Sequence, residues 1–415
     1  MSIVLTFALA GIILILGFIG NYLFKKTSIP DILILVFLGF LIGPAFKIVD
    51  PVVLTPISQL FATLALIIIL FDGGLNLELK KVLQDSPKAM MLAFLGVFIS
   101  MAFTSLFANL VLGWDIMMGL LLGVIIGGTS SSIVIPLISR LNIDEKISTI
   151  LSLESAFTDA IVVVLSLTIL QFLMFPNAAG VYNFAGGIAG AFSIAIIIGL
   201  VIGIIWLKVL KIIRRETYDD ILTLAVVLLF YAITETLGGN GAIFALTFGL
   251  VLGNGIRISR FIGIRKGIEA SKVMRKFESQ ISFFIRTFFF VYLGLILAVS
   301  NFMAIFYSIV LIVILVFGRY IGVILTSIKN TILEENKVLM SVVLPRGLAA
   351  AVLAQIVKSS NIPGTEIFPD IIILIIIYSV IISTLGVSII GRKIKKTDGM
   401  KKAKSSPVTP SQKTK

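Results

Sequence analysis

The chain has 415 residues, of which 58% are hydrophobic and 13% charged, and it has a formal net charge of +13 with no cysteine and no histidine. Soluble globular proteins have about 25% charged residues, so this composition predicts a polytopic membrane protein. The missing residue types exclude a disulfide framework, thiol catalysis and any histidine-ligated metal or haem. We interpret the positive charge as a bias of the loops on one membrane face, and not as a nucleic-acid surface.

Apolar stretches recur along the whole chain at lengths that suit a bilayer, which takes about 20 apolar residues to cross. They predict an all-α protein with about thirteen transmembrane helices, at residues 3–24, 30–46, 53–72, 88–113, 115–139, 147–173, 184–211, 219–237, 241–254, 277–299, 302–328, 338–357 and 368–391. Residues 1–395 then form one transmembrane domain, in which 255–276 is a basic amphipathic linker on the cytoplasmic face. Residues 396–415 are rich in Lys, Ser and Pro and are expected to be a disordered cytoplasmic tail.

Basic residues alternate between successive connections. Every second connection is basic, beginning with Lys25 and Lys26, whereas the others contain only Lys47 and Lys358. Cytoplasmic loops are enriched in Lys and Arg. The pattern predicts a multi-pass protein of the cell membrane with its C-terminus in the cytoplasm and, because the number of spans is odd, its N-terminus outside.

The span at 147–173 holds two carboxylates, Glu154 and Asp159, in its middle. Asp159 is about twelve residues from the helix start, or about 18 Å along the axis, which is near the bilayer centre. A charged group there costs about 2.5 to 17 kcal/mol, and chains that keep one usually use it to carry ions or protons. Ser155 shares a helix face with Asp159, and Thr158 shares one with Glu154. Oxygen ligands for a hard cation therefore gather at one level.

Two other spans contain residues that weaken a helix. The run Gly-Gly-Thr-Ser-Ser-Ser at 127–132 lies in the fifth span, and Pro-Arg-Gly at 345–347 lies in the twelfth. Interrupted helices expose backbone carbonyls and half-helix ends to a cavity, and a pair of them is the best sequence indication of a transport site. A packing face of small residues would also explain the first run.

Buried cations in a membrane need anionic partners. The intramembrane arginines are Arg286, Arg319 and Arg346. The carboxylates available inside spans are Glu154, Asp159, Asp72 and Glu235. We assign Arg286 to Glu154, which leaves Asp159 free to bind an ion. The other two arginines are expected to compensate charge, and Asp72 and Glu235, near helix ends, are expected to be structural.

Taken together, these motifs resemble the monovalent cation/proton antiporters, on the NhaP-like sodium/proton exchanger side. The motifs are Glu154-Ser155-x-x-x-Asp159, the Gly-Thr-Ser break before it, Arg286 in an aromatic helix and the Pro-Arg-Gly break, and the resemblance covers roughly the first 395 residues. It implies thirteen helices with an inverted repeat, in which a core domain with two crossed, unwound helices moves against the dimerisation domain of a homodimer. It also implies that the fifth and twelfth spans cross and that the sixth carries the site.

Two positions depart from the pattern of that family. Relatives often have asparagine where this chain has Thr158, and electrogenic relatives have a second aspartate, so the resemblance favours one proton per cation. Relatives often have an aspartate where this chain has Ser130, so one ligand charge is missing. The Kef-type potassium/proton branch therefore stays open.

The sequence thus predicts an antiporter that exchanges a monovalent cation, with Na⁺ as the first candidate, for H⁺ across a lipid bilayer. The predicted cation- and proton-binding residues are Asp159, Ser155, Glu154, Thr129, Thr158 and Ser130, of which Asp159, Ser155 and Thr129 are the direct cation ligands. No cofactor and no nucleic-acid partner are expected. The alternatives are a K⁺/H⁺ antiporter and a cation channel, although the chain lacks a repeated carbonyl filter. Only Asp159 is deep enough for an intramembrane aspartyl protease, which needs two facing aspartates, so no enzymatic activity is expected.

Overall fold

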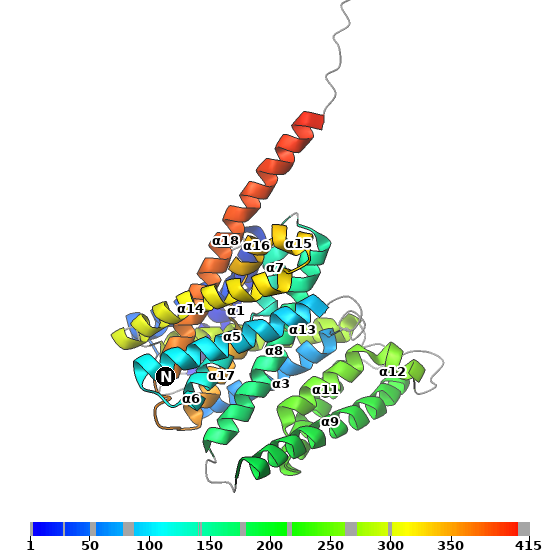
Figure 1. Ribbon diagram of the computed structural model, residues 1–415. Helices are drawn as coiled ribbons and strands as arrows, with labels where there is room; N and C mark the ends of the chain where they lie inside the picture. Colours follow the sequence, from blue (N-terminus) through cyan, green and yellow to red (C-terminus); the bar gives the residue numbers. More distant parts are fainter. Residues whose placement is uncertain are drawn as a thin grey trace, which may run out of the picture.

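The computed structural model describes residues 3–27, 30–49, 55–77, 87–139, 141, 143–174, 180–213, 218–261, 272–297 and 301–405, and all regular structure within these ranges is helical (Figure 1). The helices are α1 (Ile3–Thr27), α2 (Asp31–Phe40) with its π-helical continuation η1 (Leu41–Ala45), α3 (Thr55–Asn76), α5 (Pro87–Leu112), α6 (Ile116–Ile125), α7 (Ser131–Ile138), α8 (Glu145–Met174), α9 (Gly180–Ile213), α10 (Asp219–Thr236), α11 (Gly241–Gly253), α12 (Gly255–Phe261), α13 (Lys272–Ile296), α14 (Phe302–Ser327), α15 (Thr331–Glu335), α16 (Lys337–Val342), α17 (Leu348–Ser359) and α18 (Phe368–Ser405).

Helices occupy each of the predicted spans. In the part of the chain that the structure describes, seven of them are long and apolar enough to cross a membrane. The predicted spans at 115–139 and 338–357 are each divided into two helices, α6 with α7 and α16 with α17. Both divisions fall on the glycine- and proline-containing runs that the sequence singled out.

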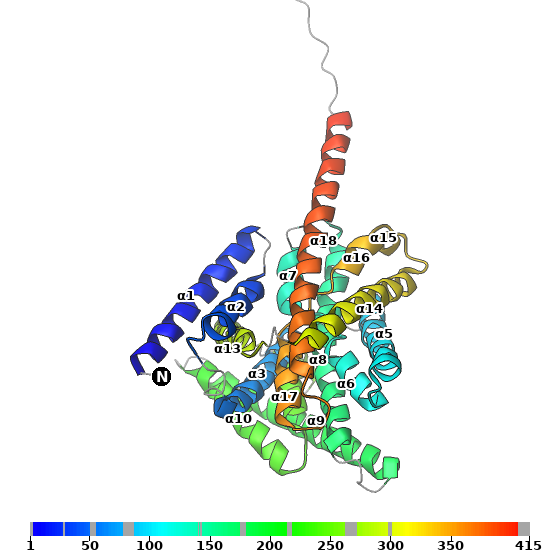
Figure 2. The same ribbon diagram turned by 90° about the vertical axis from the view of Figure 1, so that its left-hand side faces the viewer.

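The helices form two groups that meet along one interface. The α3 bundle comprises α1, α2, α3, α9, α10, α11 and α13, and the α8 bundle comprises α5, α6, α7, α8, α14, α16, α17 and α18. Figure 2 shows α1, α2 and α13 on one side of the molecule and α5, α6 and α14 on the other. The two bundles touch mainly where α3 and α13 face α17 and where α3 faces α8.

Glycines allow α3 and α11 to pack closely within the α3 bundle. A Cβ atom on Gly74 would collide with the carbonyl oxygen of Leu246, and one on Gly249 would collide with that of Phe71. Small residues let helix backbones approach each other in membranes. Helix packing therefore explains Gly74, which lies two residues after Asp72 in the sequence.

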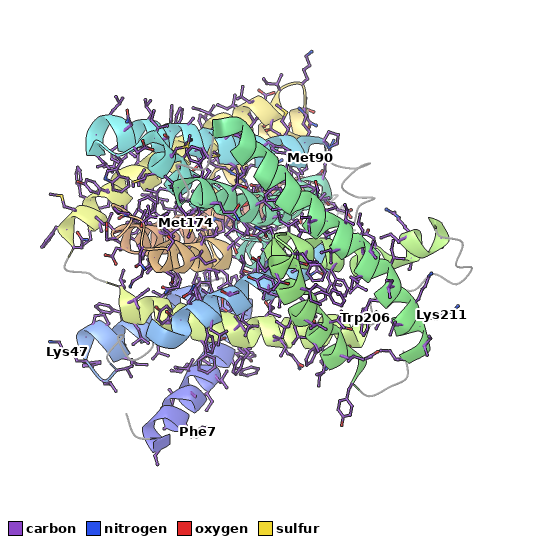
Figure 3. The ribbon with its side chains drawn as sticks, turned by 90° about the horizontal axis from the view of Figure 1, so that it is seen from below. Phe7, Lys47, Met90, Met174, Trp206 and Lys211 are labelled. Carbon is purple, nitrogen blue, oxygen red and sulfur yellow. The ribbon has the colours of Figure 1, made fainter. Side chains whose placement is uncertain are left out.

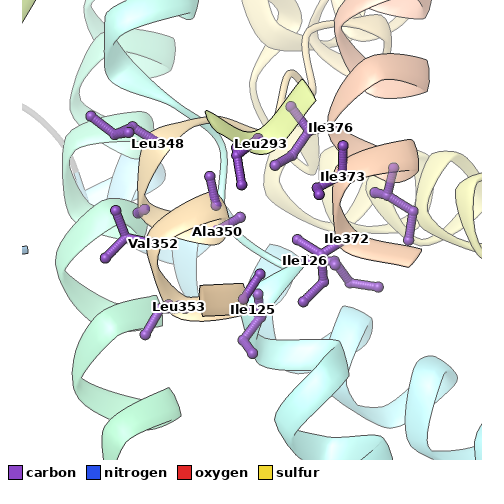
Figure 4. Packing of buried hydrophobic residues seen from close by; sticks show 14 of the residues in the cluster. Ile125, Ile126, Leu293, Leu348, Ala350, Val352, Leu353, Ile372, Ile373 and Ile376 are labelled. Carbon is purple, nitrogen blue, oxygen red and sulfur yellow. The ribbon is translucent and has the colours of Figure 1, made fainter. Parts of the chain in front are cut away.

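The short helix α17 is the centre of the largest hydrophobic core. Every residue from Leu348 to Gln355 is buried. Figure 4 shows Ala350 of α17 on the side of Leu293 of α13, the end of α6 and isoleucines of α18, and Val352 and Leu353 on the other side of the same helix. Isolated helices of this length are marginal in water, so the packing around α17 stabilises it.

The outer helices expose large apolar side chains. Phe7 of α1 is 75% exposed and Ile197 of α9 is 60% exposed. Figure 3 shows Phe7 toward the free end of α1 and, at another edge of the molecule, Trp206 and Lys211 on α9. Such apolar surfaces suit contact with lipid.

Helix α18 differs from the prediction for the C-terminal segment. It continues to Ser405 and so includes residues 396–405, which we expected to be disordered (Figure 1). Lys, Met and Ala are good helix formers, and a helix that already exists propagates without a new nucleus. Residues 406–415 of the predicted tail and residues 262–271 of the predicted linker lie outside the described ranges.

Candidate functional site

The interruption between α6 and α7 lies against α8. A Cβ atom on Gly128 would come within 2.7 Å of the Val162 side chain, so glycine is needed for this approach. The Thr158 hydroxyl accepts the Thr129 N–H at 3.0 Å and lies 3.1 Å from the Thr129 carbonyl oxygen, to which it can donate. Thr158 therefore satisfies backbone groups that the interruption releases.

The interruption between α16 and α17 lies against the first one. The Ser130 N–H donates to the Pro345 carbonyl at 2.8 Å. The Arg346 Nη1 donates to the Gly128 carbonyl at 2.7 Å, and a Cβ atom on Gly347 would collide with the Ser130 hydroxyl. Each interruption thus supplies hydrogen-bond partners to the other, which keeps non-helical backbone tolerable inside a membrane protein.

Asp159 belongs to α8, and its side chain lies at the N-terminus of α7. Its Oδ2 accepts the Ser131 hydroxyl at 2.7 Å and the Ser131 N–H at 3.3 Å. The N-terminal N–H groups and the helix dipole favour a negative charge at this place. Among the described residues, no Lys or Arg pairs with Asp159, whereas both Glu154 and Asp31 have an arginine partner.

Asp159 lines a cavity of about 560 Å³, here called the Asp159 cavity, between the two bundles. Its polar lining residues are Asp72, Asn76, Ser130, Ser131, Ser132, Glu145, Ser148, Thr149, Ser152, Asp159, Ser282 and Arg286. A branch of about 540 Å³ shares Asp72 and Arg286 and continues between α1 and α13. The cavity follows α8 from its first residue, Glu145, to Asp159, which is about 21 Å at 1.5 Å per residue.

The partner of Glu154 is Arg319, so the predicted pairing of Arg286 with Glu154 is wrong. The Arg319 Nη1 and Nη2 donate to the Glu154 Oε1 and Oε2 at 2.9 and 3.2 Å, and the side chains are 3% and 1% exposed. Arg286 pairs instead with Asp31 of α2 at 3.3 Å. Arg319 is on α14, in the same bundle as α8, whereas Arg286 is on α13 in the other bundle. The sequence gives the depth of each arginine but not its neighbouring helices.

Only two of the predicted binding residues, Asp159 and Ser130, line the Asp159 cavity among the described residues. Ser155 is fully buried, and its hydroxyl donates to the Ser152 carbonyl of its own helix at 3.0 Å. The Thr129 hydroxyl donates to the Glu154 Oε1 at 3.0 Å. In this conformation Ser155, Thr129, Glu154 and Thr158 therefore lie behind the cavity wall.

The sequence did not single out Ser131 as a partner of Asp159, and it predicted only a structural role for Asp72. Ser131 is the only hydroxyl residue that donates to Asp159 in the described structure, because it is the first residue of α7 and presents its N–H and hydroxyl together. Its place in the run at 127–132 was a signal, but the run does not show where α7 begins. Asp72 lines the cavity with Asp159, and its Oδ1 accepts the Asn76 amide at 2.9 Å.

Two further carboxylates differ in their surroundings. Glu235 accepts the Gly241 N–H at 2.7 Å at the start of α11, a contact consistent with the expected structural role. Glu278 of α13, which we did not count among the intramembrane acids, has no exposed surface, and neither of its oxygens has a hydrogen-bond partner in the described structure. A charged carboxylate in such a place is unfavourable.

Comparisons with known proteins agree with this arrangement. Residues 11–393 match the family model described as "Sodium/hydrogen exchanger, transmembrane". The probable Na(+)/H(+) antiporter 2 of Methanocaldococcus jannaschii is 28% identical over 390 residues, which is 89% of this chain and 88% of that relative. The K(+)/H(+) antiporter NhaP2 of a Shewanella species is 25% identical over 381 residues, and the match covers 89% of this chain and 64% of that protein.

The fold has a solved counterpart. The structure of the sodium proton antiporter MjNhaP1 from Methanocaldococcus jannaschii superposes with a TM-score of 0.78 at 23% identity and covers 95% of this chain and 99% of that one. Two interrupted helices in contact, beside an acid in a membrane-embedded cavity, define an integral membrane transporter. The chain belongs to the transmembrane sodium/hydrogen exchanger family.

Proposed function

We propose that this protein exchanges a monovalent cation, Na⁺ in the first place, for H⁺ by alternating access, and that the two ions compete for Asp159. The observation that carries the proposal is the position of Asp159, which lies in a cavity at the N-terminus of α7 and pairs with no described Lys or Arg. The family membership and the relatives named as Na⁺/H⁺ antiporters support it.

Competition at one carboxylate is sufficient for exchange. An ionised, empty Asp159 is unfavourable once the cavity closes and water leaves, so the protein changes conformation only with a proton or a cation bound. Either ligand then permits the same transition, and each excludes the other. No separate relay between two sites is required.

The cation shell proposed from this geometry begins with Asp159 and the Ser131 hydroxyl. Ser130 and Asp72 are two of the other polar residues that line the same cavity. Ser155 and Thr129 remain predicted ligands, and they reach the cation only if their hydroxyls leave the Ser152 carbonyl and Glu154.

Alternating access requires the α8 bundle to move against the α3 bundle, because the Asp159 cavity lies between them. In this proposal the interruptions at α6–α7 and α16–α17 are the crossed, unwound pair of an inverted repeat, and the α3 bundle forms the interface of a homodimer. The cavity begins at the first turn of α8, beside the basic Lys146. By the distribution of basic loops, this end faces the cytoplasm, with the N-terminus outside and the C-terminus inside.

Electroneutral exchange of one proton per cation is part of the proposal, because the residue immediately before Asp159 is Thr158 and not a second aspartate. The second candidate is K⁺/H⁺ exchange. It is supported by the NhaP2 relative and by Ser130, because a serine in place of the aspartate that relatives often have leaves the site with less negative charge. A weaker negative field favours K⁺ over Na⁺, because the smaller Na⁺ ion gives up its hydration shell less readily.

The experiment is cation-driven proton flux in proteoliposomes that contain the purified protein and a pH-sensitive dye. Pulses of Na⁺, Li⁺ and K⁺ are compared at a clamped membrane voltage. We expect Na⁺ to drive proton movement at a rate independent of voltage. Cation flux that ignores an opposing proton gradient would indicate a channel, and a K⁺ response far above the Na⁺ response would establish the second candidate.

A further inference from the structure

A second large cavity lies at the opposite end of the interface between the bundles. It has a volume of about 790 Å³ and is here called the Gln355 cavity. It is lined by Ser58 of α3, Tyr292 of α13 and Gln355 of α17, among other residues. The same three helices line the Asp159 cavity with residues nearer their other ends, such as Asp72, Arg286 and Leu348. The two cavities therefore lie along one path between α3, α13 and α17.

A hydrogen-bonded bridge closes the interface at the Gln355 cavity. The Gln355 Nε2 donates to the Ser58 hydroxyl at 3.0 Å, and the Tyr292 hydroxyl donates to the Gln355 Oε1 at 3.2 Å. Gln355 and Ser58 are 3% and 4% exposed. Gln355 belongs to the α8 bundle, and the other two residues belong to the α3 bundle. Both the nitrogen and the oxygen of the Gln355 amide therefore bond across the interface.

An apolar layer separates the bridge from Asp159. Ala62 and Leu66 of α3, Phe289 of α13 and Val352 of α17 are all buried and belong to one continuous core. Figure 4 shows Val352 within this core, with Leu293 of α13 on the neighbouring helix. An ion cannot cross such a layer, so the path is open at the Asp159 end and closed at the Gln355 end.

We propose that the Gln355 cavity is the closed second entrance of the same ion path, and that Gln355 is the latch that holds it closed. This inference rests on the proposed alternating access. When the bundles move, the apolar layer parts and Gln355 releases Ser58 and Tyr292. The released groups face a polar cavity where water can replace the lost partners, so the bridge breaks and reforms reversibly. A neutral amide also adds no charge that would retain the cation on its way out.

The test uses the absence of native cysteine in the chain. A single reporter, Ala62→Cys, places a thiol in the apolar layer, where a small water-soluble reagent reacts only when the Gln355 end opens. In full-length protein in lipid nanodiscs, Gln355→Leu is expected to raise the labelling rate about tenfold, and Tyr292→Phe, which removes one bond, about fivefold. The matched control is Gln59→Leu, the same change at an exposed glutamine of the same cavity.

Labelling of Ala62→Cys at the same rate in Gln355→Leu, Tyr292→Phe and the Gln59→Leu control would overturn the latch. If Gln355→Leu does not fold, Tyr292→Phe and Ser58→Ala decide, because each removes a single hydroxyl. The labelling rate is measured without any ion gradient, so it does not depend on exchange. If Gln355→Leu is labelled faster but the wild-type protein shows no cation/proton exchange, the latch is retained and the proposed function is refuted. Normal exchange with unchanged labelling would refute the latch alone.

Discussion

Glu154 and Asp159 are two carboxylates on one helix at nearly the same depth, and the structure gives them opposite surroundings. Glu154 is 1% exposed and is held by both terminal nitrogens of Arg319. Asp159 is half-buried, accepts hydrogen bonds from Ser131 and lines an open cavity. A fixed arginine neutralises the first charge permanently, whereas the second is available to a mobile ion. In the proposed mechanism, the partner of a buried acid, and not its depth, determines whether it can bind a transported ion.

Helix geometry explains how neighbours in the sequence reach such different places. Five residues advance the side-chain direction by roughly 140° around an α-helix after one full turn. Glu154 therefore points into the α8 bundle toward α14, while Asp159 points toward α7 and the interface with the α3 bundle.

The strongest test of this comparison is Asp159→Asn. The amide keeps the size of the side chain but binds neither a proton nor a cation, so exchange should fall by more than about 100-fold while the unfolding temperature changes little. The measurement pairs proteoliposome flux with thermal unfolding. Glu145→Gln, which removes an acid at the mouth of the same cavity, should retain exchange. Comparable loss in both variants would show that the general charge of the cavity matters, and not Asp159 in particular.

Glu154→Gln, in contrast to Asp159→Asn, should mainly lower the stability of the protein. It leaves Arg319 buried without a counter-charge, which costs about 3–5 kcal/mol, and Arg319→Met exposes Glu154 to the same penalty. In a double-mutant cycle followed by thermal unfolding, the double variant should lose less than the sum of the single losses. Simple additivity would mean that the pair contributes nothing specific.

Ser131→Ala should sharpen the description of the Asp159 side. It removes the hydroxyl that donates to Asp159 at 2.7 Å, and hydrogen bonds to charged groups are worth about 1.5–3 kcal/mol. Because this hydroxyl is part of the proposed cation shell, we expect the apparent affinity for the cation to fall by about tenfold at fixed pH. The affinity is measured from initial rates at varied cation concentration. Ser148→Ala, in the same cavity, is the control, and an equal response from both serines would contradict a specific role of Ser131.

Glu278 provides a third kind of carboxylate, fully buried with neither a described hydrogen-bond partner nor a place in the Asp159 cavity. Glu278→Met should stabilise the protein by about 1 kcal/mol, because the cost of burying the unpartnered group disappears. The measurement is thermal unfolding, with the exposed Glu334→Met as the control. A lower unfolding temperature would show that Glu278 makes a favourable contact in solution.

Local features of the fold were predictable from the sequence, whereas contacts between distant helices were not. Helix positions follow from hydropathy, and both interruptions follow from glycine and proline, which act on their own backbone. The pairing of Glu154 with Arg319 depends on which helices are neighbours, and no spacing in the sequence contains that information. The i, i+4 spacing placed Ser155 on the face of Asp159, but its hydroxyl bonds to its own helix. Asp31 was overlooked because it begins a span, where an acid needs no special explanation.

The central claim, that one cation and one proton compete for Asp159, is tested most directly by proton release on cation binding. Na⁺ is added to the purified protein in weakly buffered detergent solution, and bound cation and released protons are both counted. We predict one proton released for each cation bound to the wild-type protein, and neither binding nor release in Asp159→Asn. Cation binding without proton release, or unchanged binding by Asp159→Asn, would contradict the claim.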